Sequence, residues 1–469
     1  MTLLTPDNAL IGLAILALYL VVPRRWSDRV LLAGSLALVA RLTGPYAVVF
    51  AWMTLGTWLT PRASRRWPRA ATAIFAFGVA ANLAALALFK YRPSTLHGVG
   101  LRLLGQGAPE ALGPVVVPLG ISYFALQAIS YLADVRRGRA SPSSGLVEVA
   151  LYLLYFPKFL AGPVERAGEF LARLAAPRRI DNERLARSST LIVLGLARKF
   201  VIANPLFAIS GLGDFQAGDA PAGLFAAAAL AAYVFAVYND FAGYTNLAQG
   251  ISAFFGLDLS PNFRQPFFAQ GFADFWSRWH ASLTGWLKEY VYFPLTRVLL
   301  RASGGRASAV ALVAPPVLTL LASGLWHGAC AQLIGWGGVV GVLMALESVI
   351  GRAGWARRWR AIGAASVLRS LAVTVGMSLS VVLFALPVPE ALTFWRSLVA
   401  PSAGQVHPAL LPLLGVSLLL DALQGRAGDD AAPARWPLPL RASGLALAVL
   451  LTFLALRASG PRVFIYQGF

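Results

Sequence analysis

The chain has 469 residues, of which 58% are hydrophobic and 13% are charged, and its formal net charge is +20. An ordinary soluble domain has about 25% charged residues, so this composition excludes a soluble globular protein and indicates a membrane protein. The positive charge would suit nucleic acid, but the arginines occur in short clusters between apolar runs rather than along one soluble face. We therefore expect membrane lipid as a partner and no nucleic acid.

Apolar runs long enough to approach a membrane span recur along the whole sequence. A helix needs about 20 mainly apolar residues to cross the hydrocarbon layer. Candidate spans lie near 7–22, 30–42, 45–60, 72–89, 113–133, 146–163, 189–211, 220–238, 308–326, 330–350, 366–386, 408–422 and 441–458. The sequence therefore predicts an all-α, polytopic integral membrane protein with about ten to thirteen helical segments, organised as a single membrane domain over 1–469.

Two arginine clusters flank the early spans. One contains Arg24, Arg25 and Arg29, and the other contains Arg62, Arg65, Arg66 and Arg69. Lys and Arg concentrate in cytoplasmic loops and attract anionic headgroups, so topology and lipid contact explain these clusters without a specific anionic ligand.

The segment 258–306 is aromatic and amphipathic, too polar to span a membrane and too rich in Trp and Phe for a solvated loop. This pattern favours an interfacial or re-entrant helix. Asp274 and Arg278 are spaced i,i+4 and are expected to pair. On a continuous helix, Trp276, His280 and Thr284 would share one face.

The run 308–350 is too long for one membrane-spanning helix. A straight helix of that length would extend about 65 Å, roughly twice the hydrocarbon layer, so the run must break. Pro315-Pro316 and Ser323-Gly324 are the natural breaking points. A turn near 324–328 would place His327 at the junction of two helices.

His327 is the strongest candidate for chemistry, because an ionisable side chain in an apolar run is costly and usually faces protein or a water-filled cavity. A buried neutral imidazole is suited to accept a proton from a hydroxyl group. A histidine hydrogen-bonded between packed helices is an equally good interpretation at this point. His280 has an alternative interpretation too, as a residue exposed at the membrane interface.

Several other mechanisms lack support in the sequence. The single cysteine, Cys330, excludes an intrachain disulfide and a cysteine-based metal site, and only four histidines are present. A GxSxG nucleophile elbow is absent around any plausible span. We expect no metal and no bound cofactor, which leaves catalysis by positioning and one base.

Six motifs in the order of the chain resemble the membrane-bound O-acyltransferase family. They are Pro118-Leu-Gly-Ile-Ser-Tyr-Phe124, Phe156-Pro-Lys-Phe-Leu-Ala-Gly-Pro-Val-Glu-Arg166, Asp240-Phe-Ala-Gly-Tyr-Thr245, Asn262-Phe-Arg-Gln-Pro266, Phe275-Trp-Ser-Arg-Trp-His280 and Gly324-Leu-Trp-His-Gly328. Gln127 and Asp134 accompany the first motif. The distinctive motifs lie within 115–345, although the resemblance covers most of the chain.

Within the family, the pattern is similar to the bacterial alginate O-acetyltransferase branch. The segments 161–166 and 290–295 favour this branch over the related branch that moves D-alanine onto teichoic acids. Lys288-Glu289 stands where the resemblance leads us to expect Arg-Asp, and Thr296-Arg297-Val298 replaces an expected Gly-Gly-Asn-Arg. These departures affect the acceptor or partner more than the chemistry.

The resemblance implies a ring of helices around a thin core crossed by a tunnel, where a cytoplasmic acyl donor meets an extracytoplasmic acceptor. It assigns the catalytic histidines to His327 and His280. Candidates for lining the tunnel are Trp326, Asn239, Asp240, Tyr244, Asn262, Trp276, Arg278, Trp279, Glu165 and Arg166. Helix-end hydrogen bonding for Asn239, Asp240 and Tyr244, and a cap or surface ion pair for Glu165 and Arg166, are structural alternatives.

The expected function is acyl transfer from acyl-CoA, taken as acetyl-CoA, to a hydroxyl of an exported alginate-like polysaccharide or of a carrier protein, in a bacterial cytoplasmic membrane. His327 acts as a base or as part of an acyl relay, and extracytoplasmic acetylation proteins are expected partners. D-alanyl or other acyl transfer to teichoic acid, peptidoglycan or a lipid-linked sugar is an alternative. A non-catalytic membrane transporter or scaffold is the other alternative.

Overall fold

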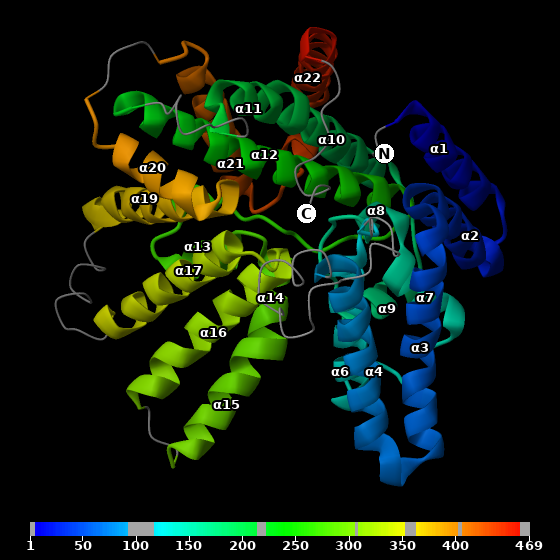
Figure 1. The fold of residues 1–469 in the computed structure, drawn as a ribbon. Helices are drawn as coiled ribbons and strands as arrows, with labels where there is room; N and C mark the ends of the chain where they lie inside the picture. The colour runs from blue at the N-terminus through cyan, green and yellow to red at the C-terminus, as the bar shows by residue number, and fades with distance from the viewer. Residues whose placement is uncertain are drawn as a thin grey trace. The chain divides into compact units, whose positions relative to one another are not determined.

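The computed structural model describes residues 5–91, 117–212, 222–304, 308–351, 363–401 and 406–459, and every regular element in these ranges is helical (Figure 1). Within these ranges, nine helical segments are long and apolar enough to cross a membrane. One of them, Arg24–Arg66, contains two helices that separate at Gly44, where φ is +58°. The structure confirms an all-α, multi-pass membrane architecture.

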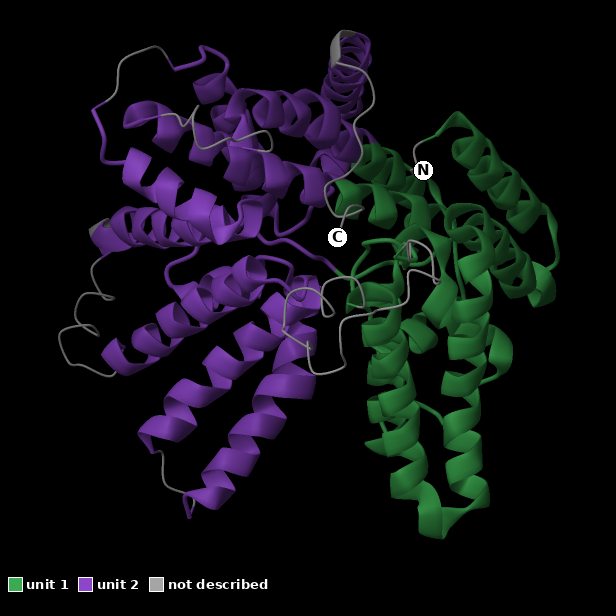
Figure 2. Ribbon diagram, in the orientation of Figure 1, with its two compact units in different colours: residues 1–192, 244–260, 463–468 green, residues 193–243, 261–462, 469 purple. Residues whose placement is uncertain are grey.

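The chain forms two compact units (Figure 2). Unit 1 contains residues 1–192 and 244–260, and unit 2 contains residues 193–243 and 261–462, apart from the last few residues of the chain. The helix α12, Leu224–Phe254, supplies its first part to unit 2 and its remainder to unit 1. The single domain over 1–469 stays a prediction.

Unit 1 is built around α6, whose residues are nearly all buried. Its helices are α1 Pro6–Val21, α2 Arg24–Thr43, α3 Ala47–Arg66, α4 Ala71–Leu86 with a π-helical end Ala87–Tyr91, α6 Ile121–Arg136, α7 Leu146–Leu154, α8 Phe156–Phe159, α9 Ala167–Ala175 and most of α10 Asn182–Ala197. The expected span at 146–163 is wrong as a single helix. The chain leaves helical geometry at Tyr155, directly before the short α8, which has Pro157 in its first turn.

Unit 2 contains the remaining helices. They are the π-helix η5 Arg198–Ala203, α11 Asn204–Ser210, most of α12, the 3-10 turn η7 Pro266–Phe268, α13 Phe272–Arg278, α14 Ala281–Leu287, the π-helix η8 Lys288–Tyr292, α15 Phe293–Ala302, α16 Ala309–His327, α17 Ala331–Ile350, α19 Ser366–Ala385, α20 Val388–Ser397, α21 Leu410–Ala427 and α22 Leu438–Ser459. The helix α12 has 31 residues and continues well beyond the expected end at 238. Its later polar residues are buried, so they hydrogen-bond within the protein rather than ending the helix.

The break predicted in the 308–350 run lies directly after His327. The helix α16 continues through Pro315-Pro316 and ends at His327, and α17 begins at Ala331. The two helices pack closely side by side (Figure 1). A Cβ atom on Gly324 would lie 2.2 Å from the carbonyl oxygen of Leu333, so only glycine permits this approach.

The aromatic segment 258–306 forms several short helices rather than one. Helix α13 ends at Arg278 and α14 starts at Ala281, with His280 between them at a φ of +45°. The expected shared helical face of Trp276, His280 and Thr284 is therefore wrong, because the left-handed backbone at His280 interrupts the helical periodicity. The expected Asp274–Arg278 pair is confirmed, with a nitrogen–oxygen distance of 2.7 Å.

A methyl group at Gly337 should separate α16 from α17. The new Cβ atom would lie 2.2 Å from the backbone oxygen of Leu320, whereas a Cβ atom on Gly335 has nothing within 4 Å. We expect Gly337→Ala to cost about 1–3 kcal/mol of stability by overpacking. Gly335→Ala should stabilise the same helix by up to about 1 kcal/mol through helix propensity. Thermal unfolding of both variants in one detergent tests this, and equal melting temperatures would contradict it.

Candidate active site

His327 ends α16 inside a box of aromatic side chains. Its side chain is buried, and its residue is 6% exposed. The imidazole centroid lies 4.7 Å from that of Trp326, 5.5 Å from that of Trp336 on α17, and 5.0 Å from that of Phe384 on α19. Three helices therefore define the position of this imidazole. The surrounding aromatic rings exclude bulk water on several sides.

His280 is buried in unit 2, with 2% of its surface exposed. This excludes the interpretation of an exposed interfacial histidine. Its Nδ1 lies 3.0 Å from Oδ1 of Asn262, and its ring packs edge-on against Phe241 at 4.7 Å. The backbone N–H of Ala281 also donates to the Asn262 carbonyl oxygen at 2.8 Å, so Asn262 holds both the side chain and the backbone of this corner.

The environment of His280 favours one protonation state. Burial lowers the pKa of His280 to about 3, so the ring is neutral at physiological pH. Because Oδ1 of Asn262 is an acceptor that also receives the Ser282 hydroxyl at 2.8 Å, Nδ1 is the nitrogen that donates. The proton on Nδ1 leaves Nε2 as the acceptor nitrogen of the ring.

A continuous series of rings joins the two histidines within unit 2. From His280 it passes through Phe241, Phe263, Trp279, Phe275, Trp276 and Trp336 to His327, with successive centroids 4.7 to 5.9 Å apart. Two motifs far apart in the sequence therefore meet in one aromatic cluster. Trp326, Trp276, Trp279 and Asn262, all predicted site residues, belong to this cluster or contact it.

Two buried donors in the aromatic cluster lack a hydrogen-bond partner. The indole nitrogens of Trp276 and Trp336 are enclosed, and no acceptor reaches them within the part of the chain that the structure describes. A buried donor without a partner costs about 1–3 kcal/mol, so such groups call for a bound water or ligand. The Trp336 indole lies against the His327 ring, and the Trp276 indole lies against that of Trp336.

Asn239 and Asp240 belong to a buried charge network in unit 2. Asn239 Oδ1 accepts from Arg198 Nη1 at 2.9 Å, and Arg198 Nη2 pairs with Asp421 on α21 at 2.8 Å. Lys199 pairs with Asp240. These contacts connect η5, α12 and α21. Asn239 and Asp240 therefore have a structural role in holding these helices together.

The π-helical turn η5 allows two consecutive cationic side chains to bind residues of one helix, α12. Arg198 and Lys199 are consecutive, and so are their partners Asn239 and Asp240 on α12. A π-helix inserts a residue into an α-helix and is frequent at functional sites. A Cβ atom on Gly243 would lie 3.2 Å from the Arg198 Cβ, so a glycine keeps the two backbones close.

The remaining predicted site residues lie in unit 1 or at a helix surface. Glu165 is buried, pairs with Arg173, and accepts the Ser260 backbone N–H at 2.6 Å. Arg166 donates to the Val164 carbonyl oxygen at 2.9 Å. The Tyr244 hydroxyl lies 3.4 Å from the Ala161 nitrogen, and Arg278 holds Asp274 at the partly exposed end of α13. Their roles in a tunnel stay predictions.

Sequence reasoning missed several buried charges that have a visible signal. Arg198 and Lys199 fall inside the expected span 189–211, Asp421 inside 408–422, and Lys158 inside 146–163. Lys158 is fully buried and donates to Gln127 and to the Tyr152 carbonyl oxygen. A charge inside an apolar run was the criterion that selected His327, and it applies equally to these residues.

No metal centre is formed by the described ranges. Among those residues, no group of three or more His, Cys, Asp or Glu side chains is placed to hold a metal ion.

Removing one partner of the Arg198–Asp421 pair should be strongly destabilising. Arg198→Met leaves a carboxylate buried without its cation, which costs about 3–5 kcal/mol, while Arg198→Met with Asp421→Leu should recover part of the loss. The exposed Arg301→Met is the matched control. Thermal and denaturant unfolding in detergent measure this, and a double variant no more stable than the single variant would refute the pairing argument.

The buried His280 should make the fold sensitive to acid. Its pKa falls from 6.5 when unfolded to about 3 when folded, so between these values only the unfolded chain binds the proton. Stability from this group is intact above pH 6.5 and falls by about 1.4 kcal/mol per pH unit below it. His280→Gln should flatten the pH dependence of unfolding between pH 6.5 and 5, and His407→Gln, at an exposed position, should not. An unchanged slope in His280→Gln would contradict this.

Comparison with known proteins agrees with the motifs. Residues 118–384 match the model of the MBOAT, membrane-bound O-acyltransferase family, which is more than half of the chain. The chain is 33% identical over 279 residues to a probable alginate O-acetylase AlgI of Pseudomonas syringae, covering 58% of this chain and 51% of the relative. It is 31% identical over 344 residues to the protein of the same description in Pseudomonas aeruginosa, covering 72% and 64%.

A peptidoglycan O-acetyltransferase of Helicobacter pylori is also similar, at 30% identity over 296 residues, which is 58% of this chain and 54% of that protein. The chain thus spans about half to two thirds of the length of these curated relatives. The family match includes both histidine motifs and the aromatic cluster between them. The chain is therefore a multi-pass membrane protein of the membrane-bound O-acyltransferase family.

Proposed function

We propose that this protein transfers an acetyl group from cytoplasmic acetyl-CoA to a hydroxyl group of an exported polysaccharide or of a carrier protein, with His327 as the general base. The observation that carries the proposal is the position of His327. It is buried at the α16–α17 junction and enclosed by Trp326, Trp336 and Phe384. A single basic group in a water-poor site is the arrangement that proton abstraction from a hydroxyl requires.

The proposed reaction is one acyl substitution. The acceptor oxygen forms an ester bond to the acyl carbon, and the carbon–sulfur bond of the thioester breaks. The hydroxyl proton passes to His327 and then to the departing thiolate, which leaves as CoA. Because the imidazole ends as it began, no further reactant is needed.

The unpartnered indole N–H groups of Trp276 and Trp336 support this chemistry. The thioester carbonyl oxygen gains negative charge in the transition state, and enclosed donors at that oxygen lower the barrier. The Trp336 ring contacts the proposed base at 5.5 Å, and the Trp276 ring contacts that of Trp336 at 5.8 Å, which supports this role.

His280 has a different role in this proposal. Its pKa of about 3 makes it a poor proton acceptor at neutral pH, since an effective base has a pKa near the working pH. Its hydrogen bond to Asn262 fixes its orientation. We assign it to holding the acceptor hydroxyl through Nε2, as a hydrogen-bond acceptor.

The acceptor class follows from the relatives. Those of higher identity are described as acting on alginate, and another is described as acting on peptidoglycan. Both are extracytoplasmic polymers with sugar hydroxyls, so an alginate-like polysaccharide is the preferred acceptor. Transfer to an exported polymer also implies acetylation proteins on the far side of the membrane. D-alanyl transfer to teichoic acid is the alternative. The acyl donor that the protein accepts distinguishes it from this proposal.

His327→Ala should lower the transfer rate by about 10²- to 10⁴-fold, the usual contribution of a general base. The measurement is acetyl-CoA consumption and acetyl-ester formation by the purified protein in detergent, at equal folded amounts. His280→Ala should raise KM for the acceptor more than it lowers kcat. The matched control is His407→Ala, whose exposed imidazole lies outside the cluster and whose loss should change neither value.

Two outcomes would redirect this proposal. Full transfer activity in His327→Ala would remove the proposed base, whereas the absence of transfer by the folded native chain would favour a transporter or scaffold. An acetyl group trapped covalently on His327 after rapid quenching would replace the base mechanism with an acyl relay.

A further inference from the structure

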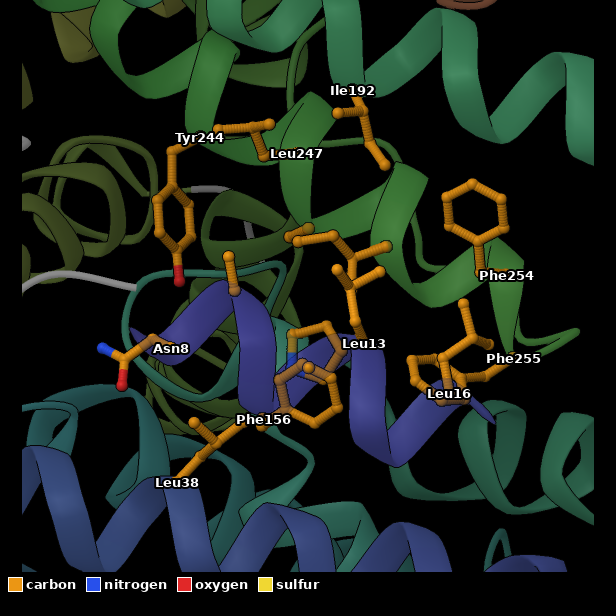
Figure 3. Close-up of a pocket in the computed structure, with 15 residues that line it drawn as sticks. Asn8, Leu13, Leu16, Leu38, Phe156, Ile192, Tyr244, Leu247, Phe254 and Phe255 are labelled. Carbon is orange, nitrogen blue, oxygen red and sulfur yellow. The ribbon is translucent and has the colours of Figure 1, made fainter. Parts of the chain in front are cut away.

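Unit 1 contains an apolar pocket between α1 and the last part of α12 (Figure 3). Its volume is about 360 Å³, within the range of pockets that hold small molecules. Residues of α1 from Asn8 to Leu16 line one wall, and residues of α12 from Tyr244 to Phe254 line the other. Asn8 and Leu16 are separated by about 12 Å along the helix, so the pocket is elongated along α1.

The lining is almost wholly hydrocarbon. Apart from Asn8 and Tyr244, which lie at one end, the pocket is lined by apolar side chains and by Gly12. Leu13, in the α1 wall, is 62% exposed. Because α1 is apolar and next to helices long enough to span the bilayer, this exposed wall faces lipid rather than water. The pocket is thus accessible from the membrane.

A buried arginine lies beside the opposite end of the pocket. The side chain of Arg178 is 2% exposed and pairs through one nitrogen with Asp28. Its Nε and Nη1 are buried and form no hydrogen bond of normal geometry with the residues that the structure describes, and the guanidinium carbon lies 5.7 Å from the centroid of the Tyr19 ring. A guanidinium carries five N–H donors, three of them on Nε and Nη1, and leaving these desolvated is costly. These donors therefore indicate an anion.

Contacts through Tyr19 and Gly256 link the arginine to Phe255 at the edge of the pocket. Phe255 lines the pocket, and the ring of Tyr19 packs against it at 5.2 Å while its hydroxyl donates to the Phe255 carbonyl oxygen at 2.8 Å. A Cβ atom on the next residue, Gly256, would lie 2.8 Å from the Arg178 Cβ. Arg24 adds a second cation nearby, because its Nη2 donates to the Ala176 carbonyl oxygen at 2.9 Å, two residues before Arg178.

The surroundings of this end are typical of a membrane interface. Arg24, Arg25 and Arg29 begin α2, and Arg29 lies over the exposed ring of Trp26, 4.6 Å from its centroid. Tryptophan and clustered arginines concentrate at headgroup depth on the cytoplasmic face. An apolar pocket that ends beside cations at headgroup depth fits an amphiphilic molecule with an anionic headgroup.

We propose that unit 1 binds one molecule of membrane phospholipid, with an acyl chain in the α1–α12 pocket and its phosphate on Arg178. This inference is independent of the acyltransfer reaction. The exposed Leu13 wall and the elongated apolar lining select a membrane lipid over a soluble anion. The positive charge of Arg178 and the N–H groups on its Nε and Nη1, which lack a hydrogen bond of normal geometry, select a phosphate-bearing lipid over a neutral one.

Two variants separate the chain site from the phosphate site. A side chain at Gly12 meets no atom within 4 Å of its Cβ, so Gly12→Leu fills the pocket without a backbone clash. Gly56→Leu on α3 is the matched control, since Gly56 is equally open but lies outside the pocket. Arg178→Gln removes the charge, and Arg179→Gln at the neighbouring exposed position is its control.

The experiment is native mass spectrometry of the full chain in detergent, titrated with dioleoyl phosphatidylglycerol, with dioleoylglycerol, and with inorganic phosphate. We expect one phosphatidylglycerol to bind the native chain in preference to dioleoylglycerol. Arg178→Gln should weaken this binding by about ten- to a hundredfold, the loss expected for a charge-assisted contact. Gly12→Leu should weaken it at least about tenfold, because the new side chain occupies the pocket, while both controls bind normally. Circular dichroism confirms that each variant is folded.

Three results would overturn the inference. Unchanged phosphatidylglycerol binding in a folded Gly12→Leu variant would exclude the pocket as the chain site. The phosphate contact would be excluded if the native chain bound dioleoylglycerol as tightly as phosphatidylglycerol and Arg178→Gln weakened neither. Saturable binding of inorganic phosphate at similar affinity, insensitive to Gly12→Leu, would mean an anion site only. If Arg178→Gln does not fold, Arg178→Lys replaces it. Weakened phosphatidylglycerol binding in Arg178→Lys would support a phosphate contact that needs the planar guanidinium, and unchanged binding would contradict it. Gly12→Leu tests the chain site in either case.

Discussion

Hydrocarbon offers no hydrogen bonds, so charges inside the spanning helices of unit 2 need partners within the protein. The pairs Arg198–Asp421 and Lys199–Asp240 meet this constraint and fix the register between η5, α12 and α21. The next residue of α12 is Phe241, whose ring packs against His280. The charge network therefore positions a wall of the site, although it contributes no group to the proposed chemistry.

The two histidines occupy different environments, and this difference supports different tasks. His280 is held by the polar side chain of Asn262, in a strained backbone conformation that costs about 1–3 kcal/mol. Such strain persists only where the surrounding contacts determine it, and the hydrogen bond from the Ala281 nitrogen to Asn262 is one of them. His327 is held by rings from three helices. Aromatic packing therefore fixes the second imidazole on several sides.

Unit 1 combines a polar interior with an apolar, lipid-facing pocket. Lys158 is buried among Gln127, Tyr152 and Phe170, and burial lowers its pKa to about 7. The pocket beside α1, in contrast, has almost no polar lining. Apart from the Arg178 guanidinium, the buried charged groups named in this unit lie where other protein groups can satisfy them, and the pocket wall on α1 keeps hydrocarbon side chains.

The sequence by itself determined the helical membrane class, the family and the need for a break within the 308–350 run. Long apolar runs, ordered motifs and the length limit of a span are local properties that need no tertiary contact. It also predicted the Asp274–Arg278 pair, because an i,i+4 spacing is internal to one helix.

Only the tertiary structure decided which distant side chains meet. The interruption at His280, the ring series from His280 to His327, and the partners of Arg198, Glu165 and Arg178 all depend on contacts between segments far apart in the chain. Periodicity describes one face of one helix and carries no information on what packs against it. The charges inside apolar runs were visible in the sequence, but their counter-charges were not, since burial makes a partner necessary without specifying which helix supplies it.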